Sequence, residues 1–190
     1  KLYSNVASIM DTNNYDHTHD HDNFVCSAGS ILNDNINFGR TFIALNGDNY
    51  DLEELERQSM MYLIMHEVGH TLGLNHNMKS SSIHSISELY DANKLEGKAI
   101  SGSVMDYPAL NLNPNPKIKS PYADSSVGHY DKWAIEFGYK PYKSEQERNE
   151  ILSRSTDPLL IFGNDADILY SSRGIDPRVQ TNDMSSDPIS

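Results

Sequence analysis

The stretch of sequence that decides the fold is residues 66–76, HEVGHTLGLNH. Its HExxH part places His66 and His70 four residues apart in a helical run, so both imidazoles come to one face of the helix. Zinc takes neutral histidine nitrogens at about 2.0–2.1 Å in a tetrahedral shell, and a rigid i, i+4 pair supplies two of them. Gly73 is expected to end the helix, after which His76 returns from the turn as a third ligand. The spacing therefore predicts one catalytic zinc ion on His66, His70 and His76.

Glu67, next to the first ligand, is predicted to be the general base and acid. Three histidines leave the fourth position of zinc to a water molecule, whose pKa falls from about 15.7 toward about 7. A carboxylate beside a ligand can take a proton from that water and pass it to a leaving amine. A chance HExxH in an unrelated helix is the alternative, but Gly73, His76 and the downstream SVMDY at residues 103–107 disfavour it. The pattern indicates hydrolysis of peptide bonds.

The elements around this motif are predicted from capping residues and apolar spacing. Asp51 followed by Glu54 is an N-cap with a capping-box partner, so a helix is expected from there to Gly73. Between residues 24 and 45, short apolar pieces alternate with Asn, Asp and Gly, which is typical of brief strands in a small sheet. Shorter helices are expected at residues 86–95, at 125–138 with Ser125 or Ser126 as the cap, and at 144–154, begun by Ser144 and Glu147. A surface loop is expected at 77–102, extended or irregular chain at 108–121 and an irregular tail from 157.

The composition predicts one globular domain and disfavours two kinds of partner, while the peptide or protein substrate is expected from the zinc motif. The chain has 190 residues, with 15 Lys or Arg against 27 Asp or Glu, so its formal net charge is −12. That charge is opposite in sign to the basic surface of a nucleic-acid-binding protein. The longest apolar run, residues 60–65, has six residues, well short of the ~18–20 that a membrane helix needs. Nucleic acid and a membrane span are therefore not expected.

Other polar groups suggest weaker metal sites. The alternating Asp and His at residues 16–22 (DHTHDHD) would suit a second divalent ion, but a solvated loop is the simpler interpretation. His84 and His129 are interpreted as surface or hydrogen-bonded histidines. The single Cys26 has no second thiol for a disulfide or a CxxC site, so no cysteine chemistry is expected. The tail offers carboxylates for a structural calcium ion, although their spacing matches no calcium loop and turn-forming roles are favoured: Asp157, Asp165, Asp167, Asp176, Asp183 and Asp187.

These residues resemble the metzincin clan of zinc peptidases, whose pattern is HExxHxxGxxH followed by a methionine-containing turn. Three sequence segments are most similar to a family of large bacterial zinc-dependent metalloproteases: HEVGHTLGLNHN, SVMDY and DPRVQTNDMSSDPI. The resemblance extends over roughly residues 60–190. The resemblance implies that Met105 is the Met-turn residue, packed beneath the histidines. It also implies that Tyr107 touches the zinc or the developing oxyanion, as in some metzincin groups, with simple packing on the turn as the alternative.

The resemblance also implies an architecture and a setting. The expected fold is α+β and metzincin-like, with a small mixed sheet and the zinc helix in an upper part (residues 1–73). A lower part (74–155) would hold the Met-turn and further helices, and an irregular tail (156–190) would follow. Because the family's proteins are much longer, the chain is expected to be a catalytic domain excised from a longer protein. The setting implied is extracellular or periplasmic.

Two alternatives to an active endopeptidase stay open at this point. The domain could be a catalytically silent or latent zinc-binding domain that holds a peptide or protein partner, which the intact Glu67 disfavours. It could also be a zinc hydrolase that acts on peptidoglycan peptides, because the metal chemistry would be the same.

Overall fold

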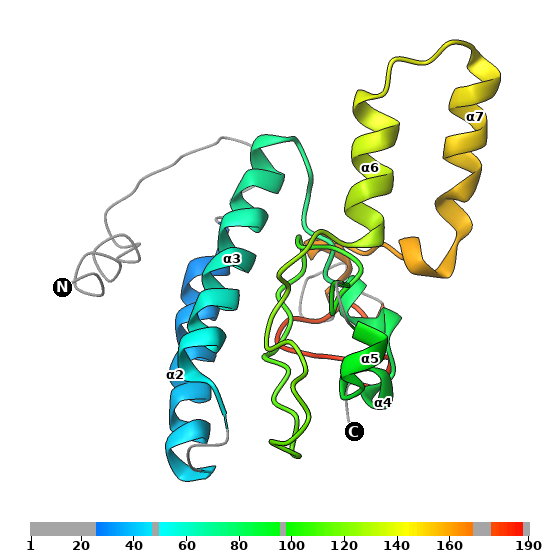
Figure 1. Ribbon diagram of the computed structural model, residues 1–190. Helices are drawn as coiled ribbons and strands as arrows, with labels where there is room; N and C mark the ends of the chain where they lie inside the picture. Colours follow the sequence, from blue (N-terminus) through cyan, green and yellow to red (C-terminus); the bar gives the residue numbers. More distant parts are fainter. Residues whose placement is uncertain (1–25, 47–49, 96–97, 169–175, 188–190) are drawn as a thin grey trace.

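The computed structural model describes residues 26–46, 50–95, 98–168 and 176–187 (Figure 1). The regular elements of these ranges are α2 (Ala28–Asn46), α3 (Leu52–Thr71), α4 (Ile86–Leu89), α5 (Ala92–Leu95), α6 (His129–Tyr139) and α7 (Glu145–Ser153), with the 3-10 turns η2 (Ser80–Ile83), η3 (Arg154–Thr156), η4 (Pro158–Leu160) and η5 (Asp165–Asp167). The helices α2 and α3 lie side by side, and α6 and α7 form a hairpin at the other end of the molecule (Figure 1). No described helix combines the length and the apolar character needed to cross a membrane.

The expected α+β fold with a small mixed sheet is wrong for the described residues, which contain helices and no strand. The segment interpreted as strands and turns is the helix α2. Its buried positions Ala28, Leu32, Ile36 and Gly39 follow one another at spacings of four, four and three residues, which is one face of a helix. Among the polar residues taken as turn signals, Asn33, Asp34 and Asn37 are exposed on that helix. Asn35 is half-buried and donates to Pro108 O at 3.4 Å.

Gly39 allows α2 to approach its neighbours closely. A Cβ atom at this position would lie 2.9 Å from Leu55 Cδ1 and 3.0 Å from Leu110 Cδ1. Leu55 itself is fully buried in the cluster that joins α2 to α3. This glycine, which also looked like a turn signal, is therefore a packing position in the middle of a helix.

The predicted helix that carries the histidines is confirmed as α3. Asp51 is its N-cap and accepts a hydrogen bond from Glu54 N at 3.0 Å. The Glu54 carboxylate turns to Arg57 and Gln58 instead of completing the capping box. Gly73, with φ of 83°, takes the left-handed conformation that lets the chain leave the helix. The local signals at both ends thus fix the position of the motif on the helix.

The later helices follow the predictions with shifted ends. The expected helix at residues 86–95 is two single turns, α4 and α5. The helix α6 begins after Gly128, whose N–H donates to Asp131 Oδ2 at 2.8 Å, and not at the serines that were expected to cap it. The helix α7 has the predicted cap, because Ser144 Oγ accepts from Glu147 N at 3.2 Å. The proline-containing stretch 108–121 is irregular, as expected.

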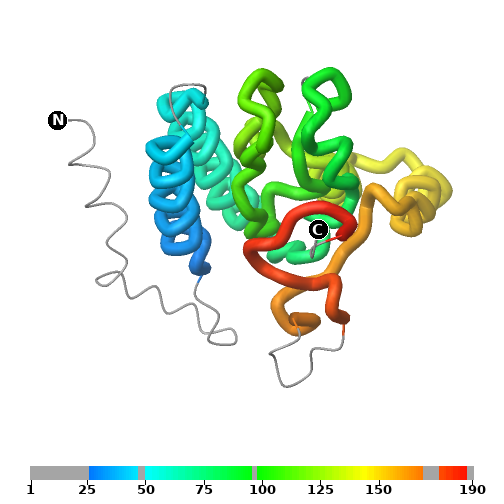
Figure 2. The backbone as a smooth tube through the Cα atoms, turned by 90° about the horizontal axis from the view of Figure 1, so that it is seen from below, coloured from blue at the N-terminus to red at the C-terminus, as the bar shows by residue number. Residues whose placement is uncertain are grey.

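The segment expected as a surface loop and the irregular tail both contribute to the interior. Residues 77–102 include the buried Met78, Ser80, Ser81, Ile100 and Ser101. In the residues that the structure describes, the tail forms only 3-10 turns, yet it packs across the central loops (Figure 2). There Asn182 N donates to Tyr107 O at 2.8 Å, and Val179 is 1% exposed. The division of the chain at residues 73 and 155 stays a prediction.

Candidate metal centre

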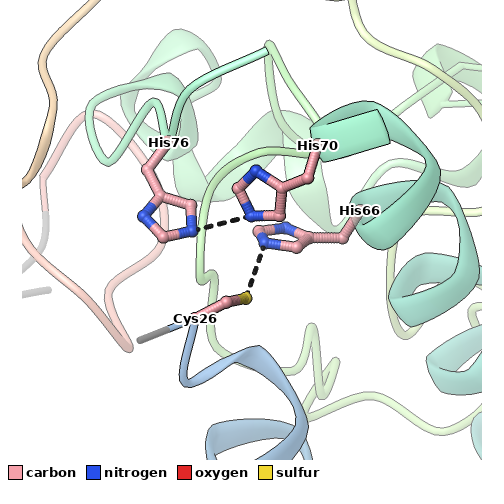
Figure 3. Close-up of side chains that lie close together, drawn as sticks. All are labelled: Cys26, His66, His70 and His76. Atoms are coloured by element: carbon pink, nitrogen blue, oxygen red, sulfur yellow. Dashed lines mark hydrogen bonds between the residues drawn. The ribbon is translucent and has the colours of Figure 1, made fainter. Parts of the chain in front are cut away.

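Three histidine side chains meet at one point beside the end of α3. His66 and His70 extend from α3, and His76 approaches from the chain that follows the turn (Figure 3). His70 Nε2 and His76 Nε2 are 3.1 Å apart. With Cys26, these residues form the group whose possible ligand atoms all lie within 4.8 Å of one another. The structure therefore brings together the three histidines that the sequence motif selects.

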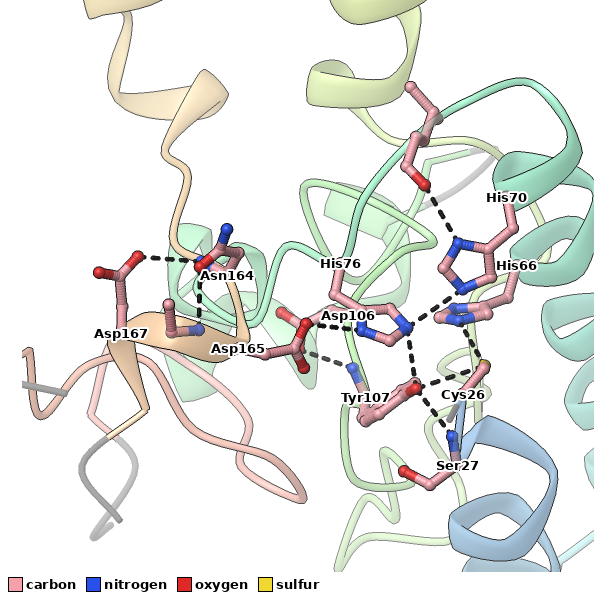
Figure 4. Close-up of polar contacts among 12 residues, drawn as sticks. Cys26, Ser27, His66, His70, His76, Asp106, Tyr107, Asn164, Asp165 and Asp167 are labelled. Atoms are coloured by element: carbon pink, nitrogen blue, oxygen red, sulfur yellow. Dashed lines mark hydrogen bonds and ion pairs between the residues drawn. The ribbon is translucent and has the colours of Figure 1, made fainter. Parts of the chain in front are cut away.

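Each of the three rings is oriented by an acceptor on its other nitrogen, and Figure 4 shows this contact between His76 and Asp165. His66 Nδ1 lies 2.7 Å from Val104 O, and His70 Nδ1 lies 3.1 Å from Leu74 O. His76 Nδ1 lies 2.9 Å from Asp165 Oδ2. Carbonyl and carboxylate oxygens can only accept, so each Nδ1 carries the hydrogen and each neutral ring turns a lone pair on Nε2 to the centre. This is the tautomer that a metal ligand needs.

The distance between the Nε2 atoms, whose lone pairs face one another, tests whether these histidines fit a zinc ion. Two neutral rings with unprotonated Nε2 atoms at 3.1 Å repel one another unless a cation lies between them. In a tetrahedral shell with Zn–N distances of about 2.0–2.1 Å, two ligand nitrogens are about 3.3 Å apart. The observed separation is close to that value, and imidazole is a ligand that zinc prefers. The residues present therefore fit a zinc ion.

The electrostatics favour a neutral His66. Its side chain is 0% exposed, and burial lowers its pKa to about 3 although the Val104 carbonyl opposes that shift. For His76, burial also disfavours the charged ring, but the hydrogen bond to Asp165 and the neighbouring Cys26 outweigh burial, so its pKa is raised. A neutral ring is ready to bind a metal, and the Asp165 carboxylate makes the His76 ring a stronger donor.

Met105 lies beneath the histidines in the loop of residues 100–107, here called the Met105 loop. Its side chain is 0% exposed. A Cβ atom on Gly69, between the two helical histidines, would be 2.3 Å from Met105 Sδ. The sulfur thus packs directly on the backbone of the HExxH turn, where only glycine leaves room. The structure places Met105 under the histidines, away from the ring of ligand atoms.

Glu67 and Tyr107, the two residues predicted to act on the substrate, both reach the centre. Glu67 Oε1 lies 3.5 Å from Cys26 Sγ, and the Tyr107 hydroxyl lies 2.9 Å from His76 Nε2 (Figure 4). Tyr107 is buried, and burial followed by the influence of Cys26 raises the pKa of its hydroxyl above the ordinary value. It therefore keeps its proton and can donate a hydrogen bond.

Buried aspartates from outside the Met105 loop hold that loop in shape. Asp131 of α6 accepts from Val104 N at 2.9 Å and from Ser103 Oγ. Asp124 accepts from Ile100 N at 2.7 Å and from Ser101 N and Oγ, and burial raises its pKa to about 6. The carbonyl that orients His66 belongs to this loop, so these aspartates position the metal centre indirectly.

Sequence reasoning missed two residues of the centre, Cys26 and Asp165. Cys26 is 40 residues from His66, and Asp165 is 89 residues from His76. Cys26 was set aside because it has no second thiol, and Asp165 was one of several tail aspartates. No spacing rule connects residues so far apart. A single cysteine together with a histidine motif was the one available signal, because thiolate is also a zinc ligand.

Of the remaining candidates, those that the structure describes lie outside the group of possible metal ligands, although Asp165 contacts one of its histidines. The DHTHDHD run at residues 16–22 is outside the described residues. The tail aspartates have separate partners, which does not support a calcium ion. Asp157 accepts from Leu159 N, Asp167 accepts from Asn164 N, and Asp183 accepts from Ser81 Oγ. Asp165 contacts His76, and Asp176 pairs with Lys79 and Arg178. His84 is half-buried, and burial lowers its pKa, whereas His129 is exposed at the start of α6.

Comparison with known proteins gives one match. Residues 48–190, well over half of the chain, match a family model described as Met-zincin. The matched range includes the three histidines, Glu67, Met105 and Tyr107. It excludes Cys26 and all of α2. No curated protein and no solved structure matches the chain.

Proposed function

The chain belongs to the Met-zincin family, and from that premise we propose that it is a zinc-dependent endopeptidase. Family membership supports a domain of the zinc metallopeptidase type. The finer proposal concerns which groups carry out the reaction and on what substrate. One observation carries it: three Nε2 atoms face a common point while an acceptor on each Nδ1 holds every ring in the metal-binding tautomer.

In this proposal His66, His70 and His76 hold the zinc ion. When bound, zinc supplies a Lewis acid that polarises the peptide carbonyl and makes a water molecule more acidic. Glu67 reaches the same space with its carboxylate, and it removes a proton from the attacking water. It then donates that proton to the nitrogen of the leaving amine, so the same residue serves as base and as acid.

Tyr107 is proposed to stabilise the negative charge that develops on the carbonyl oxygen. Its hydroxyl lies beside the Nε2 atom of a ligand and keeps its proton, so it can donate to an oxyanion near the metal centre. The Asp165 carboxylate and the Val104 carbonyl act behind the histidines, where they fix ring orientation. All these groups are placed before substrate arrives, which reduces the reorganisation that the reaction requires.

The test is a peptide-library cleavage assay with product analysis by mass spectrometry. The zinc-loaded chain is incubated with unbiased peptides in ¹⁸O-labelled water, for the wild type and for Cys26→Ala, because Cys26 lies among the reacting groups. We expect cleavage at internal peptide bonds, with one ¹⁸O atom in each new carboxyl group. A chelator should stop this cleavage, and added zinc should restore it. If a folded, zinc-loaded chain leaves every peptide intact in both forms, the endopeptidase proposal is wrong.

A parallel incubation with purified peptidoglycan addresses the other substrate class. Release of peptide fragments from peptidoglycan without cleavage of the linear library would move the proposal to a cross-link hydrolase. The same centre would serve, since zinc and Glu67 act on the bond and not on its surroundings.

A further inference from the structure

A cavity of about 550 Å³ lies at the end of α3 that is remote from the metal centre. The first turns of α3, the short helix α5 and the loop of residues 113–122 border it, and this loop runs between the two helices in both views (Figure 1, Figure 2). Pockets for small ligands have volumes of about 300–1,000 Å³. None of the residues that line this space, here called the α3–α5 cavity, belongs to the metal centre. It is therefore a second space of ligand-binding size.

The wall of the α3–α5 cavity is held in shape by hydrogen bonds to the backbone. Gln58 Oε1 of α3 accepts from Tyr122 N at 2.7 Å, and the Tyr50 hydroxyl donates to Asn113 O at 2.9 Å. Asn113 Nδ2 donates to Tyr90 O at 3.2 Å, just before α5. Gln58, Asn113 and Tyr122 are all buried. A wall fixed in this way is formed before a ligand arrives, which lowers the ordering cost of binding.

Several groups in the cavity retain hydrogen-bonding capacity for a ligand. The Tyr122 hydroxyl accepts from Asp51 N at 2.9 Å, yet no described residue accepts its own hydrogen. Tyr122 is 8% exposed, and a buried donor without an acceptor costs free energy that a ligand oxygen would recover. Asp51 Oδ1 accepts from Glu54 N at 3.0 Å, which leaves Oδ2 for a donor on the ligand. The exposed Asn93 amide, on α5, offers both a donor and an acceptor.

The charged groups of the cavity argue against an ionic ligand. Asp51 and Lys119 line it with opposite charges, and the Glu54 carboxylate is paired with Arg57 at 2.6 Å. An anion would therefore meet the Asp51 carboxylate, and a cation would meet the Lys119 ammonium group. The cavity favours a neutral ligand that carries both donors and acceptors.

A saccharide has that chemistry. Each sugar hydroxyl donates one hydrogen bond and accepts others, so it can serve both the Tyr122 hydroxyl and the Asp51 carboxylate. The C–H faces of a sugar ring need apolar or aromatic surface in the same space. The cavity provides such surface between its polar groups, from Tyr50, Leu95, Pro116, Ile118 and Pro121. The lining therefore matches a neutral saccharide better than an ion or a hydrocarbon.

We propose that the α3–α5 cavity binds a neutral saccharide and thereby anchors a substrate that carries a glycan. Saccharide binding is independent of the reaction, whereas the anchoring role rests on the proposed endopeptidase function. Helical residues advance by about 1.5 Å each, so Glu54 at the cavity and His66 at the metal centre are separated by about 18 Å along α3. An extended peptide advances by at most about 3.6 Å per residue. The glycan is therefore attached about five or more residues from the bond that is cleaved.

Saccharide binding is tested by saturation-transfer NMR on the zinc-loaded chain. The neutral probes are diacetylchitobiose, which represents the glycan of peptidoglycan, and lactose and mannobiose, which represent glycoproteins. Sialyllactose and the dimer of glucosamine are their anionic and cationic counterparts. We expect binding of at least one neutral probe, whose identity indicates the source of the glycan, and weaker binding of its charged counterpart. Absence of binding by every neutral probe, or preferential binding of a charged one, overturns the proposal.

Two variants assign the binding to the cavity. Tyr122→Phe keeps the ring and removes the hydroxyl, and Asn93→Ala removes an exposed amide. Loss of one hydrogen bond to the ligand should raise the Kd of each variant by about tenfold. Because Tyr122→Phe also removes the acceptor for Asp51 N, Asn93→Ala keeps the test decisive if the first variant is less stable. Unchanged affinity in every variant that folds contradicts the proposal.

Each variant has a control outside the cavity. Lys94 is the neighbour of Asn93 on α5 but does not line the cavity, and the Tyr142 hydroxyl donates to Phe137 O beside α6. Lys94→Ala and Tyr142→Phe should therefore bind the saccharide as the wild type does, with circular dichroism recorded for all four variants. Equal losses in the variants and their controls would place the binding elsewhere and so contradict the proposal.

The anchoring role is tested with two peptides of one sequence, that of the best-cleaved member of the peptide library. One carries the preferred saccharide about five residues from the cleaved bond, and the other carries none. We expect a KM at least about tenfold lower for the glycosylated peptide, because a second contact adds to the first, and no such difference in Asn93→Ala. Equal KM values in the wild type contradict anchoring alone. If neither peptide is cleaved, the endopeptidase function fails and saccharide binding still stands, so the two failures can be told apart.

Discussion

The helix α3 with its turn (residues 52–76) and the Met105 loop (residues 100–107) form two sides of one metal centre, but their shapes are determined differently. The helix has its N-cap at Asp51, its ligands four residues apart and its end at Gly73, all within one short stretch of sequence. The loop has no regular structure and is held by Asp124 and Asp131, which lie more than twenty residues away from their partners. Local signals place the ligands, and distant contacts place what surrounds them.

This difference explains which functional residues a sequence can disclose. His66, His70 and His76 are connected by a fixed spacing, so their convergence can be inferred without a structure. Cys26, two residues before α2, and Asp165 of η5 contact two of these histidines, at separations along the chain that follow no rule. We therefore expect that changes in the first group abolish metal binding and that changes in the second group tune it.

The largest effect is expected from His70→Ala, which removes a ligand and so tests the local side of the comparison. Zinc affinity should fall by more than the ~10–100-fold that changes behind a ligand cost. The measurement is competition with a chromophoric chelator at neutral pH. His129→Ala, an exposed histidine of α6, is the control and should leave affinity unchanged. Similar affinities for the two variants would mean that His70 is not a ligand.

The next effect concerns Asp165, which orients His76 from the tail. Asp165→Asn removes the charge but keeps an acceptor for His76 Nδ1, so zinc affinity should fall by about 10-fold, and by up to about 100-fold in Asp165→Ala. Asp167→Asn removes the same charge from the same 3-10 turn without touching a ligand. If Asp165→Asn and Asp167→Asn bind zinc equally well, the tail has no role in the metal centre.

A smaller effect, on stability, is expected at Gly69, where α3 touches the Met105 loop. An alanine there would place its Cβ 2.3 Å from Met105 Sδ, so the unfolding free energy of the metal-free chain should fall by about 1–3 kcal/mol in a urea titration. Gly138→Ala in α6 meets no atom within 4 Å and should be neutral or stabilising by up to about 1 kcal/mol. Equal stabilities of the two variants would show that Met105 does not pack on the helix.

The smallest effect is expected at Asp124, which holds the Met105 loop, and it concerns how the unfolding free energy depends on pH. Burial raises its folded-state pKa from 3.8 to about 6, so the folded chain binds the proton more tightly than the unfolded chain. Stability from this group is therefore present at low pH and declines as the pH rises from about 4 to about 6, by at most about 1.4 kcal/mol per pH unit.

Asp124→Asn should flatten that decline. The amide oxygen can still accept from Ile100 N and Ser101 N. Ser101 Oγ, which donates to Asp124, can turn its hydrogen to Ser103 O at 2.8 Å and accept from the new amide group. Urea titrations of the metal-free chain at pH 4, 5, 6 and 7 provide the measurement. If the unfolding free energy of the variant depends on pH as it does in the wild type, a group other than Asp124 causes the decline.

The same contrast accounts for what the sequence predicted about the fold. The ends of α3 and the cap of α7 follow from single residues, Asp51, Gly73 and Ser144, and these predictions are confirmed. The sheet was predicted from Asn, Asp and Gly between apolar residues, whereas the spacing of Leu32, Ile36 and Gly39 fits a helix that packs on α3. Packing against a partner decided the conformation there, and the partner is not visible in the local sequence.

The most direct test of the zinc-peptidase account is Glu67→Gln made in the Cys26→Ala chain, in which no thiol lies beside Glu67 and His66. Glutamine keeps the size of the side chain and all three histidines but cannot accept the proton. Metal content by mass spectrometry and cleavage of a quenched peptide are measured on the same samples. The account predicts about one zinc per chain with and without Glu67, and cleavage only when Glu67 is present. Undiminished cleavage by the Glu67→Gln chain, or no zinc in either chain, would contradict it.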